Sequence, residues 1–206
     1  MLKVWGRRNS INVQKVVLAL EEIGLPYERV DAGLQFGINT SPEYLAMNPM
    51  GLIPTIDDDG FVLWESNAIT RYLCAKHATG QLYPTDLRER ADAERWMDWQ
   101  GGALNTAMVP AFYNLVRAPA DKRNDAAIEA SRVKTNELVG MLEAHLAGRD
   151  YVAGGTYGIG DIGMVPIMHR WLNLPLERTP IPNIEAWYHR LMQRPACQRV
   201  LTLPLS

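Results

Sequence analysis

The chain has 206 residues, of which 47% are apolar and 21% are charged, so it has enough apolar side chains for a packed core and is not expected to be disordered. Its net charge of -2 and its lack of a basic tract give no reason to expect binding to nucleic acid or to an anionic membrane. No apolar run approaches the ~20 residues of a membrane span. The length allows one large domain or two small ones.

The first thirty residues predict a strand, a helix and a second strand. Residues 2–5 form a short apolar strand, and Asn9 or Ser10 caps a helix whose apolar positions follow the helical period. Gly24 ends this helix, and residues 27–30 form the next strand. Two strands joined through a helix predict a parallel βαβ unit.

The next segment predicts a β-hairpin that leads into another helix. Residues 31–41 are a loop and residues 42–47 a short helix. Residues 55–56 and 61–64 are strands joined by an acidic turn that ends in Gly60, and a helix opens near residues 65–67. The predicted order of elements, βαβαββα, is typical of a thioredoxin-like α/β domain.

The rest of the chain predicts helices only. We expect a domain at residues 1–78, a linker at 79–85 and an all-α helical bundle at 86–206. The predicted helices cover residues 86–117, 121–146, 160–172 and 184–192. Gly101, Gly102 and Pro110 are expected to bend the first, and Asp161 is expected to cap the start of the third at Gly158.

Two features near the hairpin suggest a peptide-binding groove. Pro54 has no N–H, so Ile53 is expected at a strand edge with free backbone groups, which can pair with an added peptide strand. Ser66 lies in the first turn of a helix, where unpaired N–H groups attract a carboxylate. Together they would hold a small peptide with an acidic end. The simpler alternative is a hairpin followed by an ordinary capped helix.

The first helix presents polar groups where a thiolate would be stabilised. Ser10 offers a hydroxyl and Asn12 an amide near the helix N-terminus, where the helix dipole favours an anion. A free thiol has a pKa of ~8.5, and a hydroxyl donor with a helix end would lower it. The alternative is that Ser10 only caps the helix.

The arrangement from Asn48 to Ile69, reading NPMGLIPT, an acidic turn and then ESNAI, resembles the cytosolic glutathione S-transferases, and the resemblance covers essentially the whole chain. Ser10 and Asn12 make the chain similar to bacterial serine-type or asparagine-containing, theta- or nu-like members. The resemblance implies a cis-proline at Pro54, pairing of Ile53 with the cysteinyl backbone of glutathione, and contact of Glu65 and Ser66 with its γ-glutamyl end.

The resemblance also implies the reaction and its remaining residues. Ser10 and Asn12 would contact the glutathione sulfur, and Asn39 would meet the glycine end, although Leu52 stands where many members carry a basic or amide side chain. A small, largely apolar electrophile would bind between the domains. Its pocket would be walled by Arg7, Met108, Phe112 and Trp171, all of which are also plausible core residues.

The implied activity is a glutathione transferase that detoxifies electrophiles, with glutathione as co-substrate and no metal. Two alternatives stay open, namely glutathione-dependent disulfide or peroxide reduction, suggested by Asn12, and a non-catalytic ligand-binding protein, suggested by Leu52 and Asn39. A homodimer is implied by the resemblance. Cys74 and Cys197 are expected to be reduced thiols in a cytoplasmic protein, and the first ten residues lack the apolar core of a signal peptide.

Overall fold

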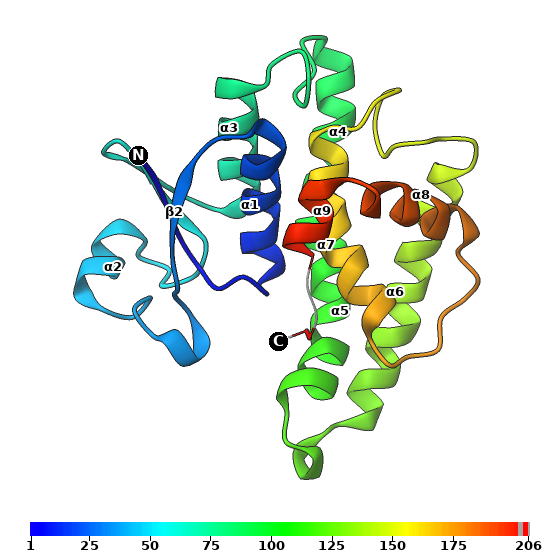
Figure 1. The fold of residues 1–206 in the computed structure, drawn as a ribbon. Coiled ribbons are helices and arrows are strands. Elements are labelled where there is room, and N and C mark those ends of the chain that lie inside the picture. The colour runs from blue at the N-terminus through cyan, green and yellow to red at the C-terminus, as the bar shows by residue number, and fades with distance from the viewer. Residues whose placement is uncertain (202–203, 206) are drawn as a thin grey trace.

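A computed structural model of the protein describes residues 1–201, 204 and 205. The N-terminal part is a small sheet with helices, and the remainder is helical (Figure 1). Helix α1 (Ile11–Ile23) lies between the sheet on one side and two helices of the C-terminal part, α7 and α9, on the other. The start of α1 therefore faces the junction of the two parts.

The sheet has four strands in the order β2-β1-β3-β4. Strand β1 is parallel to β2 and antiparallel to β3, and β3 pairs with β4 as an antiparallel hairpin. Val4 stands opposite Ile56, and both are fully buried beneath α1 and α3. The strands are β1 (Leu2–Trp5), β2 (Tyr27–Val30), β3 (Thr55–Asp58) and β4 (Phe61–Trp64).

The predicted order βαβαββα is confirmed. Helix α1 ends where Gly24 adopts a left-handed φ of 75° and its N–H reaches the carbonyl of Leu20, as expected for a glycine stop. The other helical segments of this part are η1 (Leu34–Phe36), α2 (Pro42–Met47) and α3 (Ser66–His77). The short turn η1 was not expected from the sequence.

The long helix predicted over residues 86–117 is interrupted where bends were expected. A π-helical segment contains Gly101 and Gly102, and a second follows Pro110. Gly lowers the cost of irregular backbone, and Pro removes a helical hydrogen bond, which accounts for both positions. The segments are α4 (Leu87–Trp99), η2 (Gln100–Leu104), α5 (Asn105–Phe112) and η3 (Tyr113–Arg117).

Helix α7 packs against α1, α4 and α8, and its residues are buried from Ile159 to Trp171. Helix α6 begins later than predicted because Asn124, not residue 121, accepts the capping hydrogen bond from Ala127 N–H at 2.9 Å. The short helix α9 was missed by the sequence analysis. The segments are η4 (Ala120–Lys122), α6 (Asp125–Leu146), α7 (Ile159–Asn173), α8 (Pro182–Met192) and α9 (Pro195–Val200).

The structural role expected for Asp161 is confirmed. Its carboxylate is fully buried and accepts hydrogen bonds from Gly158 N–H at 3.1 Å, Val152 N–H at 2.9 Å and the Trp187 indole N–H at 2.7 Å. Burial raises the pKa of Asp161 to about 6, while these donors oppose the rise. One carboxylate thus ties α7 to α8 and to the preceding loop.

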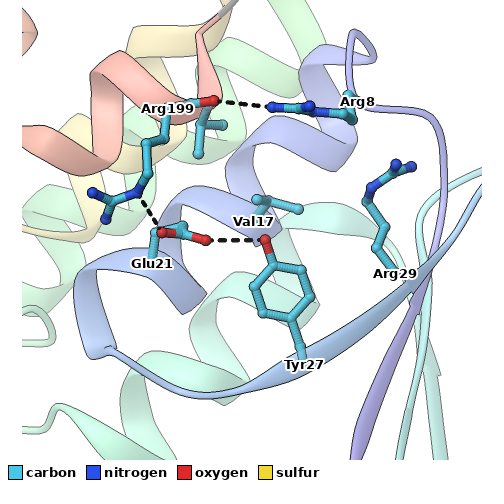
Figure 2. A pocket seen from close by; sticks show the side chains of 7 residues that line it. Arg8, Val17, Glu21, Tyr27, Arg29 and Arg199 are labelled. Carbon is cyan, nitrogen blue, oxygen red and sulfur yellow. Dashed lines mark hydrogen bonds and ion pairs between the residues drawn. The ribbon is translucent and has the colours of Figure 1, made fainter.

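Helix α9 is fastened to α1 and β2 around a cavity of about 340 Å³ (Figure 2). Glu21 on α1 accepts from the Tyr27 hydroxyl at 3.1 Å and from Arg199 Nε at 2.8 Å. Arg8 donates to the backbone carbonyl of Arg199 at 3.5 Å. Because Arg199 and Arg8 use their charged groups to join α9 to α1 and to the turn before it, we interpret this cavity as part of the contact that fixes α9 on α1.

Candidate functional site

A narrow groove runs beside the β3 edge to the start of α3. The Ile53–Pro54 peptide is cis, and no hydrogen bond within the described chain uses the backbone N–H or C=O of Ile53. The groove has a volume of about 50 Å³. Its lining consists of Asn12, Asn48, Met50, Leu52, Ile53, Pro54, Trp64, Glu65 and Ser66.

Two buried side chains hold this edge in place. The Tyr44 hydroxyl donates to the Leu52 carbonyl at 2.6 Å and lies 2.8 Å from Thr55 Oγ1. The Asn48 amide donates to the same carbonyl at 2.8 Å and to Thr55 Oγ1 at 3.1 Å. The backbone beside Ile53 is therefore fixed before any peptide arrives, which lowers the entropy cost of binding.

The far end of the groove is the N-terminus of α3. Glu65 occupies the N-cap position with a left-handed φ of 72°, an unusual conformation for a residue with a side chain. Its side chain is exposed, whereas Ser66 is buried at the first helical position. The helix dipole and the first N–H groups favour an anion here, and Glu65 favours an ammonium group beside it.

Beneath this helix start lies Lys15, a residue that the sequence analysis did not single out. Its side chain is 1% exposed, and its ammonium lies 3.4 Å from Ser66 Oγ and 3.1 Å from Asn67 Oδ1. Burial lowers the pKa of Lys15 to about 7, although the nearby Glu65 carboxylate opposes this. The sequence did carry a signal, because Lys15 stands at helical spacing from apolar residues on both sides. Ile11 lies four residues before it, and Leu18 and Ala19 lie three and four residues after it.

A second cavity, of about 190 Å³, lies between the start of α1 and the helical part of the chain. Ser10 is the N-cap residue of α1, but its side chain makes no capping hydrogen bond, so its hydroxyl is not used to close the helix. Asn12 lines both this cavity and the groove, and so joins them. The lining consists of Arg7, Ser10, Ile11, Asn12, Asn105, Val109, Phe112, Tyr113, Arg117 and Arg170.

The structure separates the residues expected around an electrophile. Arg7 and Phe112 line the cavity. Met108 and Trp171 do not, because they are packed in the core of the helical part with 1% and 0% exposure. Asn39 does not line the groove either. Its amide donates to the Gly51 carbonyl at 2.7 Å and is thereby committed to holding a loop.

The cavity carries two further arginines that the sequence analysis missed. Arg170 on α7 and Arg117 in η3 lie over the ring of Phe112, at 3.7 and 4.8 Å from its centroid. Burial and the other arginines lower the pKa of Arg170 to about 9 and that of Arg7 to about 10. Burial also lowers the pKa of Arg117. The wall is thus strongly cationic as well as aromatic.

Other kinds of site find little support in the part of the chain that the structure describes. No group of three or more His, Cys, Asp or Glu side chains is placed to hold a metal ion there. Cys74 and Cys197 are buried and form no disulfide. No helix of the described residues is both long and apolar enough to cross a membrane.

Comparison with known proteins agrees with this architecture. The family model for the glutathione S-transferase N-terminal domain matches residues 1–75, and that for the C-terminal domain matches residues 103–195. Glutathione S-transferase GstB of Escherichia coli is 44% identical over 208 residues, with both chains fully covered. The probable glutathione S-transferase GSTF1 of Oryza sativa is 31% identical, covering 97% of this chain and 94% of its own.

A solved structure gives the same result in three dimensions. The theta class glutathione S-transferase of Xanthomonas axonopodis pv. citri, crystallised with glutathione bound, superposes with a TM-score of 0.96. It is 41% identical and the match covers 100% of this chain and 99% of that one. Family models that span most of the chain, a full-length relative at 44% identity and this superposition lead to one conclusion: the chain belongs to the glutathione S-transferase family.

Proposed function

We propose that this transferase conjugates the thiolate of glutathione to a small electrophile bound between its two parts. Glutathione lies in the groove, with its cysteinyl backbone along Ile53 and its γ-glutamyl end at Glu65 and Ser66. Its sulfur points to Ser10 and Asn12. The observation that carries this proposal is that Asn12 lines both the groove beside the cis-proline edge and the cavity beyond it.

The chemistry follows from the surroundings of α1. The helix N-terminus, the Ser10 hydroxyl and the Asn12 amide each favour a thiolate over a thiol. The nearby cations, Lys15 and Arg7, act in the same direction through charge. The thiolate attacks the electrophilic carbon, an S–C bond forms, and the leaving group departs with its electron pair. Catalysis is then mainly orientation and thiolate stabilisation.

Single substitutions at the first turn test the proposal. Ser10→Ala and Asn12→Ala should each lower kcat for 1-chloro-2,4-dinitrobenzene by roughly 100-fold, as when a donor to a developing anion is removed. The thermal shift given by glutathione should change little. Ser41→Ala is the matched control, since that hydroxyl caps α2 by accepting from Tyr44 N–H at 3.3 Å. Wild-type activity in Ser10→Ala would remove Ser10 from the mechanism.

Asn12 also supports a second candidate reaction, the glutathione-dependent reduction of disulfides or peroxides, because it lines both the groove and the cavity beyond it. Assays with 2-hydroxyethyl disulfide and cumene hydroperoxide, run beside the aryl chloride, separate the two reactions. A non-catalytic ligand-binding role is suggested by Leu52, which is 59% exposed, and by Asn39, whose amide is already used. No retention on immobilised glutathione and no thermal shift would favour that role.

We further propose that the protein works as a cytoplasmic homodimer in detoxification. The apolar residues of α7 and α8 pack largely into the core, so they do not form an interface for a second copy. Exposed apolar side chains elsewhere, such as Phe61 and Leu87, are available for contact with a second copy of the chain. Sedimentation equilibrium over a tenfold concentration range tests the dimer.

A further inference from the structure

A buried cation lies directly behind the start of α3. Lys15 on α1 is 1% exposed and does not belong to the lining of the groove, whereas Ser66 does. The Lys15 ammonium lies 3.4 Å from Ser66 Oγ. One serine hydroxyl therefore separates a buried positive charge from the end of the groove at which the proposed function places the γ-glutamyl group of glutathione.

Asn67 fixes the ammonium at this position. Its side-chain oxygen Oδ1 accepts from Lys15 Nζ at 3.1 Å, while its amide nitrogen donates to the backbone carbonyl of Met97 on α4 at 2.8 Å. The amide has one defined orientation, because its oxygen faces a donor and its nitrogen faces an acceptor. Lys15 is thus held behind Ser66 by a side chain that also joins α3 to the helical part of the chain.

The contact with Lys15 determines how the Ser66 hydroxyl can act. An ammonium group only donates, so Ser66 Oγ accepts from it and the hydroxyl hydrogen points elsewhere. No hydrogen bond within the described residues uses that hydrogen. Because Ser66 lines the groove, the hydrogen is available to an acceptor there. The positive charge behind the oxygen makes the hydroxyl a stronger donor.

The charge of Lys15 lacks a carboxylate at hydrogen-bond distance in the part of the chain that the structure describes. Its hydrogen-bond partners there are two neutral oxygens. Glu65 at the start of α3 favours the charged form from further away, whereas Arg170 on α7 and Arg71 on α3 disfavour it. A buried ammonium with neutral partners is costly, so this charge stabilises an anion that binds beside Ser66.

We propose that Lys15 is a positioning residue for glutathione. It holds Ser66 Oγ as an acceptor, so that the Ser66 hydroxyl donates to the γ-glutamyl carboxylate, and it places a positive charge behind that hydrogen bond. The carboxylate in turn supplies the counter-charge that the ammonium lacks in the unliganded protein. This inference rests on the proposed function and adds to it a residue that contacts neither the peptide nor the reacting sulfur.

S-methylglutathione is the probe for the test, because it has no ionisable thiol and its affinity reports on the rest of the tripeptide. In calorimetry at pH 6.5, Lys15→Met should raise its Kd roughly 10-fold, as when a hydrogen bond of a charged group is lost. Ser66→Ala should raise the Kd at least as much. Lys134→Met, at an exposed lysine, is the matched control and should leave the Kd within about 2-fold.

The double variant shows whether Lys15 acts through Ser66. In the Ser66→Ala background, Lys15→Met should raise the Kd by less than about 3-fold, because the hydroxyl that Lys15 orients is already absent. A lysine that only supported the packing of α1 against α3 would raise the Kd about 10-fold in both backgrounds, since independent effects multiply.

The wild-type protein gives a second measurement that needs no substitution at Lys15. Burial and the two arginines lower the pKa of Lys15 to about 7, and Glu65 opposes this, so most of the ammonium groups lose a proton between pH 6 and 7.5. The Kd for S-methylglutathione should rise about 4-fold over this range, and less than about 1.5-fold in Ser66→Ala. This comparison decides the matter if Lys15→Met does not fold.

The outcomes separate this inference from the proposed function. An unchanged Kd in Lys15→Met, or the full loss of about 10-fold in the Ser66→Ala background, overturns the role of Lys15 and leaves the conjugation as proposed. An equal pH response in the wild type and in Ser66→Ala overturns it as well. No binding of S-methylglutathione and no conjugation of 1-chloro-2,4-dinitrobenzene by the wild type overturns both proposals.

Discussion

Lys15 provides a direct test of the electrostatics at the site. Its ammonium is buried under α3, and its hydrogen-bond partners among the described residues are the neutral oxygens Ser66 Oγ and Asn67 Oδ1. Burial lowers its pKa from 10.5 to about 7, the charges of Arg170 and Arg71 add to this, and Glu65 opposes it. Between these two values the unfolded chain holds a proton that the folded protein has released.

The sign of the pH dependence follows from that difference. Wherever the unfolded state binds more protons, the free energy of unfolding rises with pH. The contribution of Lys15 is therefore least favourable below pH 7 and recovers as the pH rises towards 10.5. The slope is at most about 1.4 kcal/mol per pH unit, which amounts to at most about 5 kcal/mol over the whole window.

Replacing Lys15 by Met removes this titration while keeping a long flexible side chain. We expect the free energy of unfolding of the wild type, minus that of Lys15→Met, to increase by about 3 kcal/mol between pH 7 and 9.5. Urea unfolding followed by tryptophan fluorescence at fixed protein concentration measures it. Lys134→Met, at an exposed lysine, controls for the loss of one ammonium group. A difference that stays constant within about 0.5 kcal/mol refutes the reasoning.

Two further substitutions test the fold and the groove separately. Asp161→Asn should lower the free energy of unfolding by about 3 kcal/mol, because an amide cannot accept from the donors at Gly158, Val152 and Trp187 together. Urea unfolding midpoints measure this loss. The activity per folded molecule should stay unchanged. Glu65→Gly should relieve the left-handed backbone and raise stability by about 1 kcal/mol, yet weaken glutathione binding measured by calorimetry. Tighter or equal binding in Glu65→Gly would contradict the role given to that carboxylate.

The elements that the sequence predicted well are those encoded over a few neighbouring residues. The hairpin turn ending at Gly60, the glycine stop at Gly24 and the capping carboxylate of Asp161 each depend on local chemistry, and each is present in the structure. The bends near Gly101 and Pro110 are local in the same sense. Local signals therefore defined the order of the elements and most of their bounds.

The cavity beside Ser10 was harder to predict because it is assembled from distant segments. Arg117 and Arg170 are far apart in sequence and meet only because η3 and α7 bring their side chains to the same ring, that of Phe112. Met108 and Trp171 had the right residue types, but a helical period does not say which apolar positions face a cavity and which face the core. Both belong to the buried core of the helical part.

The buried cations and the thiolate belong to one electrostatic argument. The charge of Arg170 lowers the pKa of Lys15, so the two cations are electrostatically coupled. Coupling between two ionising groups is reciprocal: a thiolate placed beside Ser10 would raise the pKa of Lys15, and by the same free energy the lysine would lower the pKa of the thiol. The same buried positive charges that cost free energy in the unliganded protein would therefore favour the thiolate in the proposed mechanism. A variant that relieves this cost should gain stability at neutral pH and lose thiolate together.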